Sequence, residues 1–203
     1  MGISRDKYST LIEKYGKESS FALWGDSVYD MSMFDEKNAP WGRVNPDYIL
    51  VAISPASEDI PGPLENFHSR NGHHGDSRLM MALKGSDIEG SFMTDASSIN
   101  ESDSGKVDIK KNDIDSLLGK INDIGSIKIV FLLTFQKKYE NLRTMLREEG
   151  YCVVDLPHYS PKNGHIKDYC LARKINIDGL NSKQQYATLV KYCISEAFKE
   201  NKK

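Results

Sequence analysis

Two strongly apolar segments, Tyr48–Ile53 and Ile127–Leu133, constrain the fold of this chain more than any other feature of its sequence. Neither segment alternates regularly between polar and apolar residues, as a strand with one solvent-facing side would. Apolar runs of this length are typical of strands that are covered on both faces, as in a parallel sheet under helices. We therefore expect a buried β-sheet with helices packed on both of its sides.

Shorter strands and helices alternate along the rest of the chain. Strands are predicted at 91–94 and 151–156, while 21–24 fits either a short edge strand or a packed loop. This alternation predicts a mostly parallel sheet. The expected fold class is α/β, with three layers (α/β/α) and a central four-stranded sheet. Apolar residues at helical spacing predict helices at 4–17, 76–84, 112–124, 137–149 and 182–200.

Length and charge narrow the class of protein further. With 203 residues, the chain fits one domain over 1–203, with a core at about 47–165, an N-terminal helix within 1–18 and a C-terminal helix at 182–200. The formal net charge of −2 argues against coating nucleic acid by bulk electrostatic attraction, but a local basic groove stays open. No segment reaches the roughly 18 apolar residues that span a bilayer. We expect a cytoplasmic protein without a membrane partner.

Small and polar residues follow the predicted strands at the points where each strand ends. Ser54 follows the first buried strand, Thr94 and Asp95 follow the next, and His158 follows the last. Right-handed crossovers bring the carboxyl ends of parallel strands to one edge of a sheet, where the ligands of open α/β sheets bind. We therefore expect these side chains to line one ligand site.

Two short motifs at this edge resemble those of the uracil-DNA glycosylase superfamily. Ala52-Ile53-Ser54-Pro55-Ala56 is similar to the family's Gly-Ile-Asn-Pro-Gly turn, and His158-Tyr159-Ser160-Pro161 keeps the His, Ser and Pro of its His-Pro-Ser-Pro motif. Phe67 stands where the family places the aromatic ring that stacks on a flipped base. The resemblance covers roughly residues 47–165 and implies a uracil-DNA glycosylase-like fold that acts on or binds a nucleobase.

The resemblance also implies roles for individual residues. His158 would stabilise the negative charge that develops on a leaving base, and Phe67 would stack on the base once it is flipped out of the duplex. Ser54 takes the place of the family's water-orienting Asp or Asn, and Thr94 or Asp95 takes the place of its base-reading Asn. Further contacts to the substrate are expected from Ala56, Arg70, Ser160, Lys162 and Asn163.

Ser54 is the main departure from the family's pattern. A serine hydroxyl can bind a water molecule, but it cannot act as a general base near neutral pH. Either a carboxylate elsewhere replaces it, with Asp95, Glu58 and Asp59 as candidates, or the chain binds its ligand without catalysis. An ionised Asp accepts hydrogen bonds only, so Asp95 would favour a ring edge rich in N–H donors over the edge of uracil.

Two function hypotheses from different classes follow. The first is a glycosylase that hydrolyses the N-glycosidic bond of a base other than uracil, with DNA or a nucleotide as its partner. The alternative is a non-catalytic module on the same fold, which would bind a nucleotide, a base or a protein partner through the same pocket. An unrelated α/β hydrolase or transferase is not favoured, because the chain has no Gly-rich phosphate loop and no Gly-x-Ser-x-Gly elbow.

A group of histidines raises the question of a metal site. The candidates are His68, His73, His74 and Asp76. Glycines separate them, so they share no fixed helix face, whereas zinc sites usually pair their ligands at closer spacing. The three cysteines are far apart and form no Cys-x-x-Cys pair. We therefore expect no metal and no cofactor.

Overall fold

Five strands form one mixed sheet in the order β1-β3-β2-β4-β5. The computed structural model describes residues 2–55, 62–68, 75–99, 101, 103, 106–159 and 165–200. Strand β2 pairs in parallel with β3 and β4, β4 pairs in parallel with β5, and β1 runs antiparallel to β3. The bounds are β1 Ser19–Phe21, β2 Asn45–Ala52, β3 Ser91–Asp95, β4 Ile129–Leu132 and β5 Cys152–Asp155.

The predicted α/β class is confirmed, but the sheet has five strands where the sequence predicted four. The additional strand, β1, is an edge strand that ends at Phe21, whereas the sequence offered an edge strand or a packed loop at 21–24; its Ser-Ser-Phe sequence has no apolar pattern that would place the strand two residues earlier. Both serines are nevertheless buried, and Ser19 Oγ donates a hydrogen bond to Thr94 Oγ1 at 2.9 Å. Strand β1 is thus stabilised by pairing with β3 and by this polar contact.

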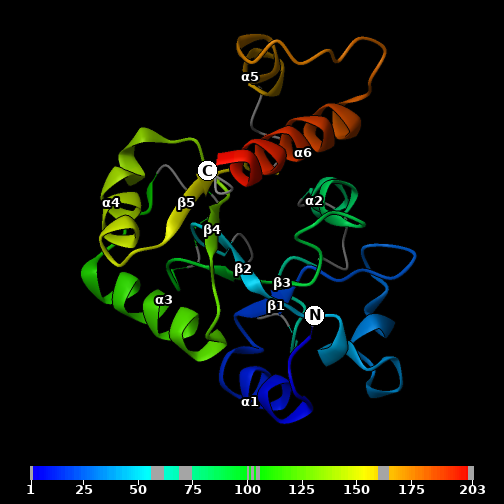
Figure 1. Cartoon of the computed structure of the whole chain (residues 1–203), viewed down its shortest axis with the longest axis vertical. Helices are drawn as coiled ribbons and strands as arrows, with labels where there is room; N and C mark the ends of the chain where they lie inside the picture. Colours follow the sequence, from blue (N-terminus) through cyan, green and yellow to red (C-terminus); the bar gives the residue numbers. More distant parts are fainter. Residues whose placement is uncertain are drawn as a thin grey trace.

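Helices cover both faces of the sheet (Figure 1). Helices α1, α3 and α4 lie on one face and α2 and α6 on the other, with α5 packed against α6. Every predicted helix is present, and α5 was not predicted. The bounds are α1 Arg5–Tyr15, α2 Asp76–Leu83, α3 Lys111–Ile124, α4 Glu140–Glu148, α5 Ile166–Ala172 and α6 Ser182–Glu200, with short 3₁₀ helices at Met31–Phe34, Glu36–Asn38, Pro40–Gly42 and Lys137–Tyr139.

The side chains of β2 explain why its sequence is apolar throughout. Ile49 and Val51 belong to the core beneath α1, α3 and α4, whereas Leu50 and Ala52 belong to the core beneath α2 and α6. All four side chains are at most 2% exposed. A strand that is buried on both faces has no polar side, as the sequence predicted.

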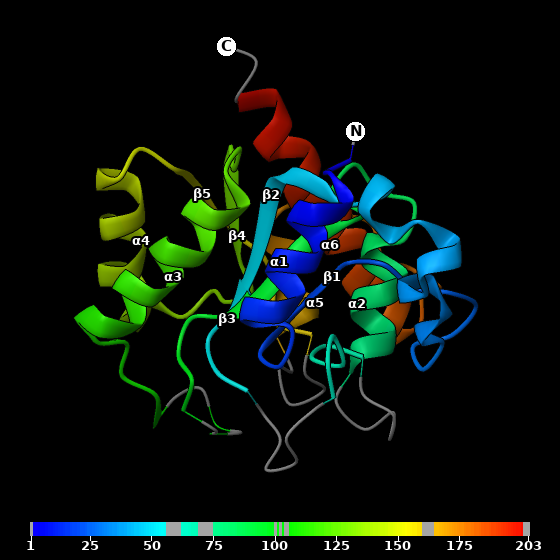
Figure 2. The ribbon, with the colours of Figure 1, turned by 90° about the horizontal axis from the view of Figure 1, so that it is seen from below.

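The parallel strands end at the same edge of the sheet. In Figure 2 this edge lies towards the bottom, and the two ends of the chain lie towards the top. The segments that follow β2, β3 and β5 therefore start near one another, although they are far apart in the sequence. This edge is where the sequence predicted the ligand site.

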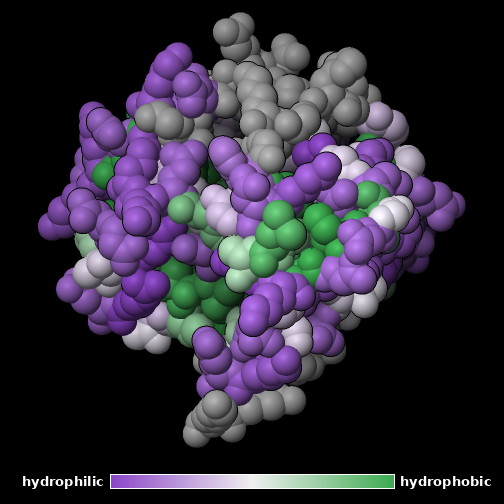
Figure 3. Space-filling model, turned by 90° about the horizontal axis from the view of Figure 1, so that it is seen from above, coloured by the Kyte–Doolittle hydropathy of each residue, from purple (hydrophilic) through white to green (hydrophobic). Residues whose placement is uncertain are grey.

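The outer surface is mainly hydrophilic, with an apolar area on the side of α5. Figure 3 views the molecule from that side and shows apolar residues among hydrophilic ones. Leu171 of helix α5 is 70% exposed. No helix in the described ranges combines the length and the apolar character that crossing a membrane requires.

Candidate functional site

Three of the predicted site residues follow strands at the same edge of the sheet. Asp95 ends β3, and its Cα pairs with that of Ala52, the last residue of β2. Ser54 follows β2 and His158 follows β5, so the single strand β4 lies between the two strands from which these residues extend. The topology thus brings the two motifs to one edge, at the distance set by one intervening strand.

The hydroxyl of Ser54 forms a hydrogen bond to the segment around Glu101. Its Oγ donates a hydrogen bond to the backbone carbonyl of Glu101 at 3.0 Å, and the N–H of Glu101 donates to the carbonyl of Pro55 at 3.1 Å. The hydroxyl proton is therefore engaged, and the remaining lone pairs of Ser54 could accept a hydrogen bond from water. Among the residues that the structure describes, no carboxylate is bonded to Ser54.

Asp95 is a buried carboxyl group, with 6% of the residue exposed. Its Oδ2 accepts a hydrogen bond from Asn66 Nδ2 at 2.9 Å. Burial raises the pKa of Asp95 to about 7, against the smaller lowering effects of the Asn66 hydrogen bond and of Lys120, while Glu18 raises it further. The protonated and ionised forms of this group are therefore both populated near neutral pH.

Thr94 lies on the other side of β3 from Asp95. Its Oγ1 accepts hydrogen bonds from Lys120 Nζ at 3.0 Å and from Ser19 Oγ at 2.9 Å. Lys120 belongs to α3, is itself buried and forms an ion pair with Glu18 at 3.3 Å. The structure thus places Thr94 in a buried polar network beneath α3 and does not bring it together with the other predicted residues.

Phe67 belongs to a short segment that is bound to the first strand and the turn before it. The N–H of Leu64 donates to Gly16 O at 2.6 Å, and Ser20 Oγ donates to Leu64 O at 2.8 Å. Leu64 and Phe67 have φ angles of 63° and 67°, in the left-handed region that side chains rarely adopt. Such a strained backbone persists only where the surrounding contacts hold it.

His158 stacks on its neighbour Tyr159. The ring centroids are 4.7 Å apart and the planes are inclined by 15°. Dense packing around the half-buried imidazole lowers the pKa of His158 to about 4. The ring is therefore neutral at neutral pH, with one nitrogen that donates and one that accepts hydrogen bonds.

Tyr159 connects the second motif with the segment that carries Phe67. Its ring meets that of Phe67 edge to face, with centroids 6.2 Å apart. Burial raises the pKa of Tyr159 well above its ordinary value, and the charges of Asp76 and Asp95 raise it further. Aromatic rings and carboxyl groups from the segments after β2, β3 and β5, and from the first turn of α2, thus gather around Tyr159.

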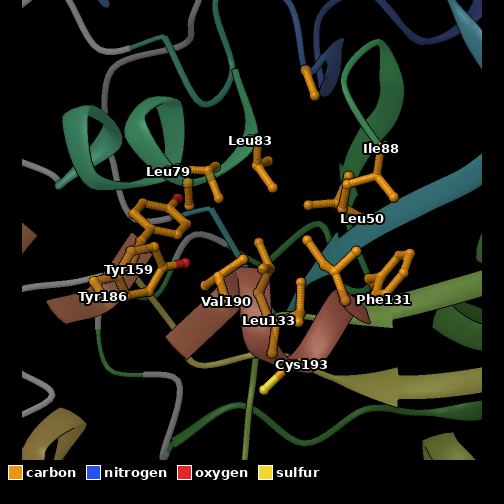
Figure 4. Close-up of a cluster of buried hydrophobic side chains, with 14 of the residues drawn as sticks. Leu50, Leu79, Leu83, Ile88, Phe131, Leu133, Tyr159, Tyr186, Val190 and Cys193 are labelled. Carbon is orange, nitrogen blue, oxygen red and sulfur yellow. The ribbon is translucent and has the colours of Figure 1, made fainter. Parts of the chain in front are cut away.

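The turn that supports His158 is fixed by helices on both faces of the sheet. Arg143 of α4 is buried, and its Nε donates to both carboxylate oxygens of Asp155, at 2.9 and 3.1 Å. From the opposite face, the hydroxyl of Tyr186 in α6 donates to Pro157 O at 3.1 Å. Figure 4 shows Tyr159 and Tyr186 beside Leu79 of α2 in the apolar core.

The remaining predicted residues take no part in this cluster or lie outside the described ranges. His68 is 1% exposed, packs against the rings of Trp24 and Phe34, and has Nε2 at 3.2 Å from Phe21 O, which is a core position. No three metal-binding side chains come together within the part of the chain that is described. Outside the described residues lie Ala56, Glu58, Asp59, Arg70, His73, His74, Ser160, Lys162 and Asn163.

A separate hollow of about 460 Å³ lies at the opposite edge of the sheet. Its lining includes Ser86, from the connection between α2 and β3, and Lys191 and Phe198 of α6. Phe198 packs against Tyr48 near the start of β2, which places the hollow at the amino ends of the parallel strands. It therefore does not belong to the cluster around Tyr159.

Sequence reasoning gave no role to Asn66 or to the side chain of Tyr159. Asn66 precedes Phe67, and Tyr159 stands inside the second motif, so both were next to residues that were singled out. Their roles depend on partners that are distant in sequence, since Asn66 bonds to a residue 29 positions away. No local spacing in the sequence indicates such a contact.

Comparisons with known proteins add no family to this description. No model of a known protein family matches the chain, and a search of curated proteins found no match.

Proposed function

We propose that the cluster around Tyr159 binds a nucleobase of DNA or of a nucleotide, in a divergent member of the uracil-DNA glycosylase superfamily. The observation that supports this proposal most is that Phe67, Tyr159, Asp95 and His158 gather at one edge of the sheet, where ligands of open α/β folds bind. Aromatic faces with a few convergent polar groups are typical of sites for flat heterocycles.

The two kinds of side chain serve different parts of a base. An aromatic face stacks on any base, at a gain of about 1–3 kcal/mol per base. The carboxyl group of Asp95 and the imidazole of His158 would make the hydrogen bonds that fix its orientation and select its edge. The proposal therefore assigns affinity to the rings and selectivity to the two polar groups.

The candidate reaction is hydrolysis of the N-glycosidic bond. The bond between the sugar C1′ and the base nitrogen breaks and its electron pair leaves with the base; water supplies a hydroxyl group to C1′, and the remaining proton of that water neutralises the departed base. A neutral imidazole can donate a hydrogen bond to the base oxygen on which negative charge develops, and His158 is held neutral by its surroundings. A purely binding module would use the same hydrogen bond from His158 without breaking the glycosidic bond.

The water-activating step is the weaker part of the candidate reaction. Ser54 cannot accept a proton from water near neutral pH, and its hydroxyl already donates to Glu101 O. We therefore expect base release to be slow. Binding without catalysis is the alternative, and the same experiments distinguish the two.

A binding experiment tests the proposal first. Free uracil, hypoxanthine, xanthine, adenine and cytosine are added in excess, and the melting temperature is recorded, because a ligand that binds only the folded state raises it. We expect at least one base to raise the melting temperature of the wild-type chain and not that of Phe67→Leu. The matched control is Phe198→Leu, since Phe198 packs beside Tyr48 near the start of β2, at the opposite edge of the sheet.

A cleavage experiment then tests the reaction. Oligonucleotides with a single uracil, hypoxanthine or xanthine are incubated with the protein and treated with alkali, which cuts the strand where a base has been removed. We expect His158→Ala to abolish cutting and His165→Ala, at an exposed position, to retain it. Base binding without strand cutting would assign the chain to the non-catalytic class. If no base binds and none is released, the proposed function is wrong.

A further inference from the structure

The hollow of about 460 Å³ lies at the amino ends of the parallel strands, on the edge of the sheet opposite to the candidate site. Its volume falls in the range of about 300–1,000 Å³ that is typical of sites for small molecules. One wall is the connection that follows α2, with Ser86 and Asp87, and the other wall is α6. The hollow is therefore separate from the cluster around Tyr159, and the proposed function gives it no role.

Helix α6 presents one stripe of side chains to the hollow. The stripe consists of Lys191, Ile194, Ser195, Phe198 and Lys199, whose spacing of three and four positions places them on one face of the helix. At a rise of 1.5 Å per residue, it is about 12 Å long. Ile194 is buried and Phe198 is half-buried, so this wall has an apolar part with a lysine at each end.

Opposite charges face the hollow from different walls without pairing with each other. The ammonium group of Lys199 lies 2.7 Å from a carboxylate oxygen of Glu196, so its charge is already balanced. Among the residues that the structure describes, neither Lys191 nor Asp87 forms an ion pair, and both are exposed. The hollow thus offers one free ammonium group from α6 and one free carboxylate from the opposite wall.

The hydroxyl of Ser86 is a further polar group beside the carboxylate of Asp87. Its Oγ is buried and has no hydrogen-bond partner in the described part of the chain. Leaving a buried hydroxyl unpaired is unfavourable. A primary ammonium group has three N–H donors, so one that entered the hollow could bond to Asp87 and, after rotation about the Cα–Cβ bond of Ser86, to this hydroxyl as well.

We infer that the hollow is a second binding site, which takes a small zwitterion with a primary amine at one end, a carboxylate at the other and an apolar stem between them. Asp87 and Ser86 bind the ammonium group, Lys191 binds the carboxylate, and Ile194 and Phe198 contact the stem. A dianion would meet the carboxylate of Asp87 and a diamine would meet Lys191, so repulsion between like charges selects against both. This inference does not depend on the proposed function.

Titration of the full chain with ω-amino acids, followed by its backbone amide NMR signals, tests the inference. The probes are β-alanine, γ-aminobutyrate and ε-aminocaproate, which separate the same two charges by stems of increasing length. We expect at least one of them to shift the signals of Gly85, Ser86 and Ser195 until saturation. Caproate and hexylamine carry one charge each and lack one of the two charged contacts, so they should bind at least about tenfold more weakly.

Exchange of the two charges gives the decisive readout. Asp87→Lys makes both free charges positive and Lys191→Glu makes both negative, so each change should weaken amino-acid binding by about tenfold or more. Asp87→Lys should instead bind glutarate, a dicarboxylate, and Lys191→Glu should bind cadaverine, a diamine. With both substitutions together, the chain should bind the amino acid again, in the reverse direction.

Two matched controls make the same changes of charge away from the hollow. Asp115→Lys in α3 and Lys183→Glu in α6 are at exposed positions that do not line it. Because solvent screens distant charges, both should leave the dissociation constant unchanged within about twofold. The melting temperature of each variant shows that it is folded.

The outcomes are separate from those of the base-binding experiments. The inference is overturned if the wild-type chain binds none of the three amino acids, or if they shift amide signals elsewhere and not those of the hollow. Amino-acid binding that stays unchanged in both Asp87→Lys and Lys191→Glu overturns it as well. Because the bases are expected at the opposite edge of the sheet, a failure at either site does not affect the proposal for the other.

Discussion

The two segments that bring aromatic rings to the candidate site are held in different ways. Residues 62–68 are bound by hydrogen bonds to the turn before β1 and to β1 itself, with two backbone positions in the left-handed region. Residues 155–159 have no such strain and are held by buried side chains of α4 and α6. Within one site, a strained segment thus faces an unstrained one.

The ring of Phe67 and the turn that carries His158 are thus both fixed in place, but by different kinds of contact. Phe67 owes its position to a backbone conformation that its side chain disfavours, so many polar contacts are needed to hold it. The position of His158 follows from the end of β5 and from two buried donors, Arg143 and Tyr186. The first segment should respond to changes in backbone preference, and the second to the loss of single side chains.

The largest effect is expected from Arg143→Met. This change removes the partner of Asp155 and leaves the carbonyls of Thr134 and Gln136 without the donor that they share. The side chain of Asp155 is 32% exposed, so the lost ion pair is partly screened. Several hydrogen bonds from the buried guanidinium, worth about 1.5–3 kcal/mol each, are nevertheless lost together, and we expect the free energy of unfolding to fall by about 3–5 kcal/mol. Urea unfolding of the variant and of the wild-type chain measures this loss in the free energy of unfolding.

Arg147→Met in the same helix is the control for this change. Arg147 is half exposed and pairs with Glu140 at the surface, where ion pairs contribute about 0–1 kcal/mol. Equal losses in the two variants would show that the turn before His158 does not depend on the buried guanidinium.

The next effect concerns Asp95 and depends on pH. Its folded pKa of about 7 lies above its ordinary value of 3.8, so the folded state keeps a proton that the unfolded state releases. The contribution of this group to stability is complete below pH 4 and is lost as the pH rises through 7. In Asp95→Asn the free energy of unfolding, relative to the wild-type chain, should therefore increase by about 2–4 kcal/mol from pH 4 to pH 8.

The comparison with the wild-type chain is needed because two histidines act in the opposite direction. The pKa values of His68 and His158 are lowered to about 4, so their contribution is present above pH 6.5 and is lost as the pH falls through 4. Asp87→Asn, at an exposed site, is the control and should show no trend. A constant difference between Asp95→Asn and the wild-type chain at all pH values would contradict the raised pKa.

A smaller effect tests the strain at Phe67. At an ordinary position, glycine is less stable than alanine by roughly 0.5–1 kcal/mol, because it loses more backbone entropy on folding. At a φ of 67° the order should reverse, so that Phe67→Gly is more stable than Phe67→Ala by about 1–2 kcal/mol. Thermal unfolding of both variants measures the difference.

The same pair of substitutions at Tyr159 is the control, because its φ is not in the left-handed region. There, Gly should be the less stable of the two. If glycine is worse than alanine at both positions, the contrast between the two segments is not a matter of backbone strain.

The smallest effect is expected from Tyr186→Phe. The change keeps the buried ring and removes the hydroxyl that donates to Pro157 O. A buried carbonyl that loses its donor typically costs about 1 kcal/mol, which denaturant unfolding can resolve. Tyr192→Phe, at an exposed position of α6, should cost less than half of that. If Tyr186→Phe leaves the free energy of unfolding unchanged, the hydrogen bond to Pro157 O does not stabilise this turn.

The sequence was sufficient for the parts of this fold that follow from local patterns. Tyr48–Ile53 predicted β2 because a strand buried on both faces has no polar side, and the spacing of Leu142 and Leu146 predicted α4. The edge strand that the sequence left open at 21–24 lies instead at Ser19–Phe21, because Ser19 and Ser20 are buried through their pairing with β3 and their side-chain hydrogen bonds. Helix α5 was missed because just two of its residues are buried.

The candidate site was predictable only in part, for the same reason. The edge of the sheet and the order of the motifs follow from strand positions, which local patterns indicate. The environment of Asp95, which sets its protonation, depends on Asn66, Lys120 and Glu18 from three other segments. Thr94 points towards α3, where Lys120 donates to it, whereas Asp95 points to the opposite face of the sheet. The contact of Thr94 with Ser19 also depends on the register between β1 and β3. Such long-range contacts leave no periodic signal in the sequence.

The contacts that hold the candidate site join segments that are far apart in the sequence, and this affects the order in which the fold can form. The contact between Ser19 and Thr94 spans 75 positions, and the helix that supplies Tyr186 is the last of the described elements. Closing a long loop lowers the entropy of the chain before the new contact stabilises it, so pairings of this kind form slowly. The cluster around Tyr159 can be complete only after both the first strand and the final helix have docked, so the proposed ligand is expected to bind the fully folded chain and not a folding intermediate.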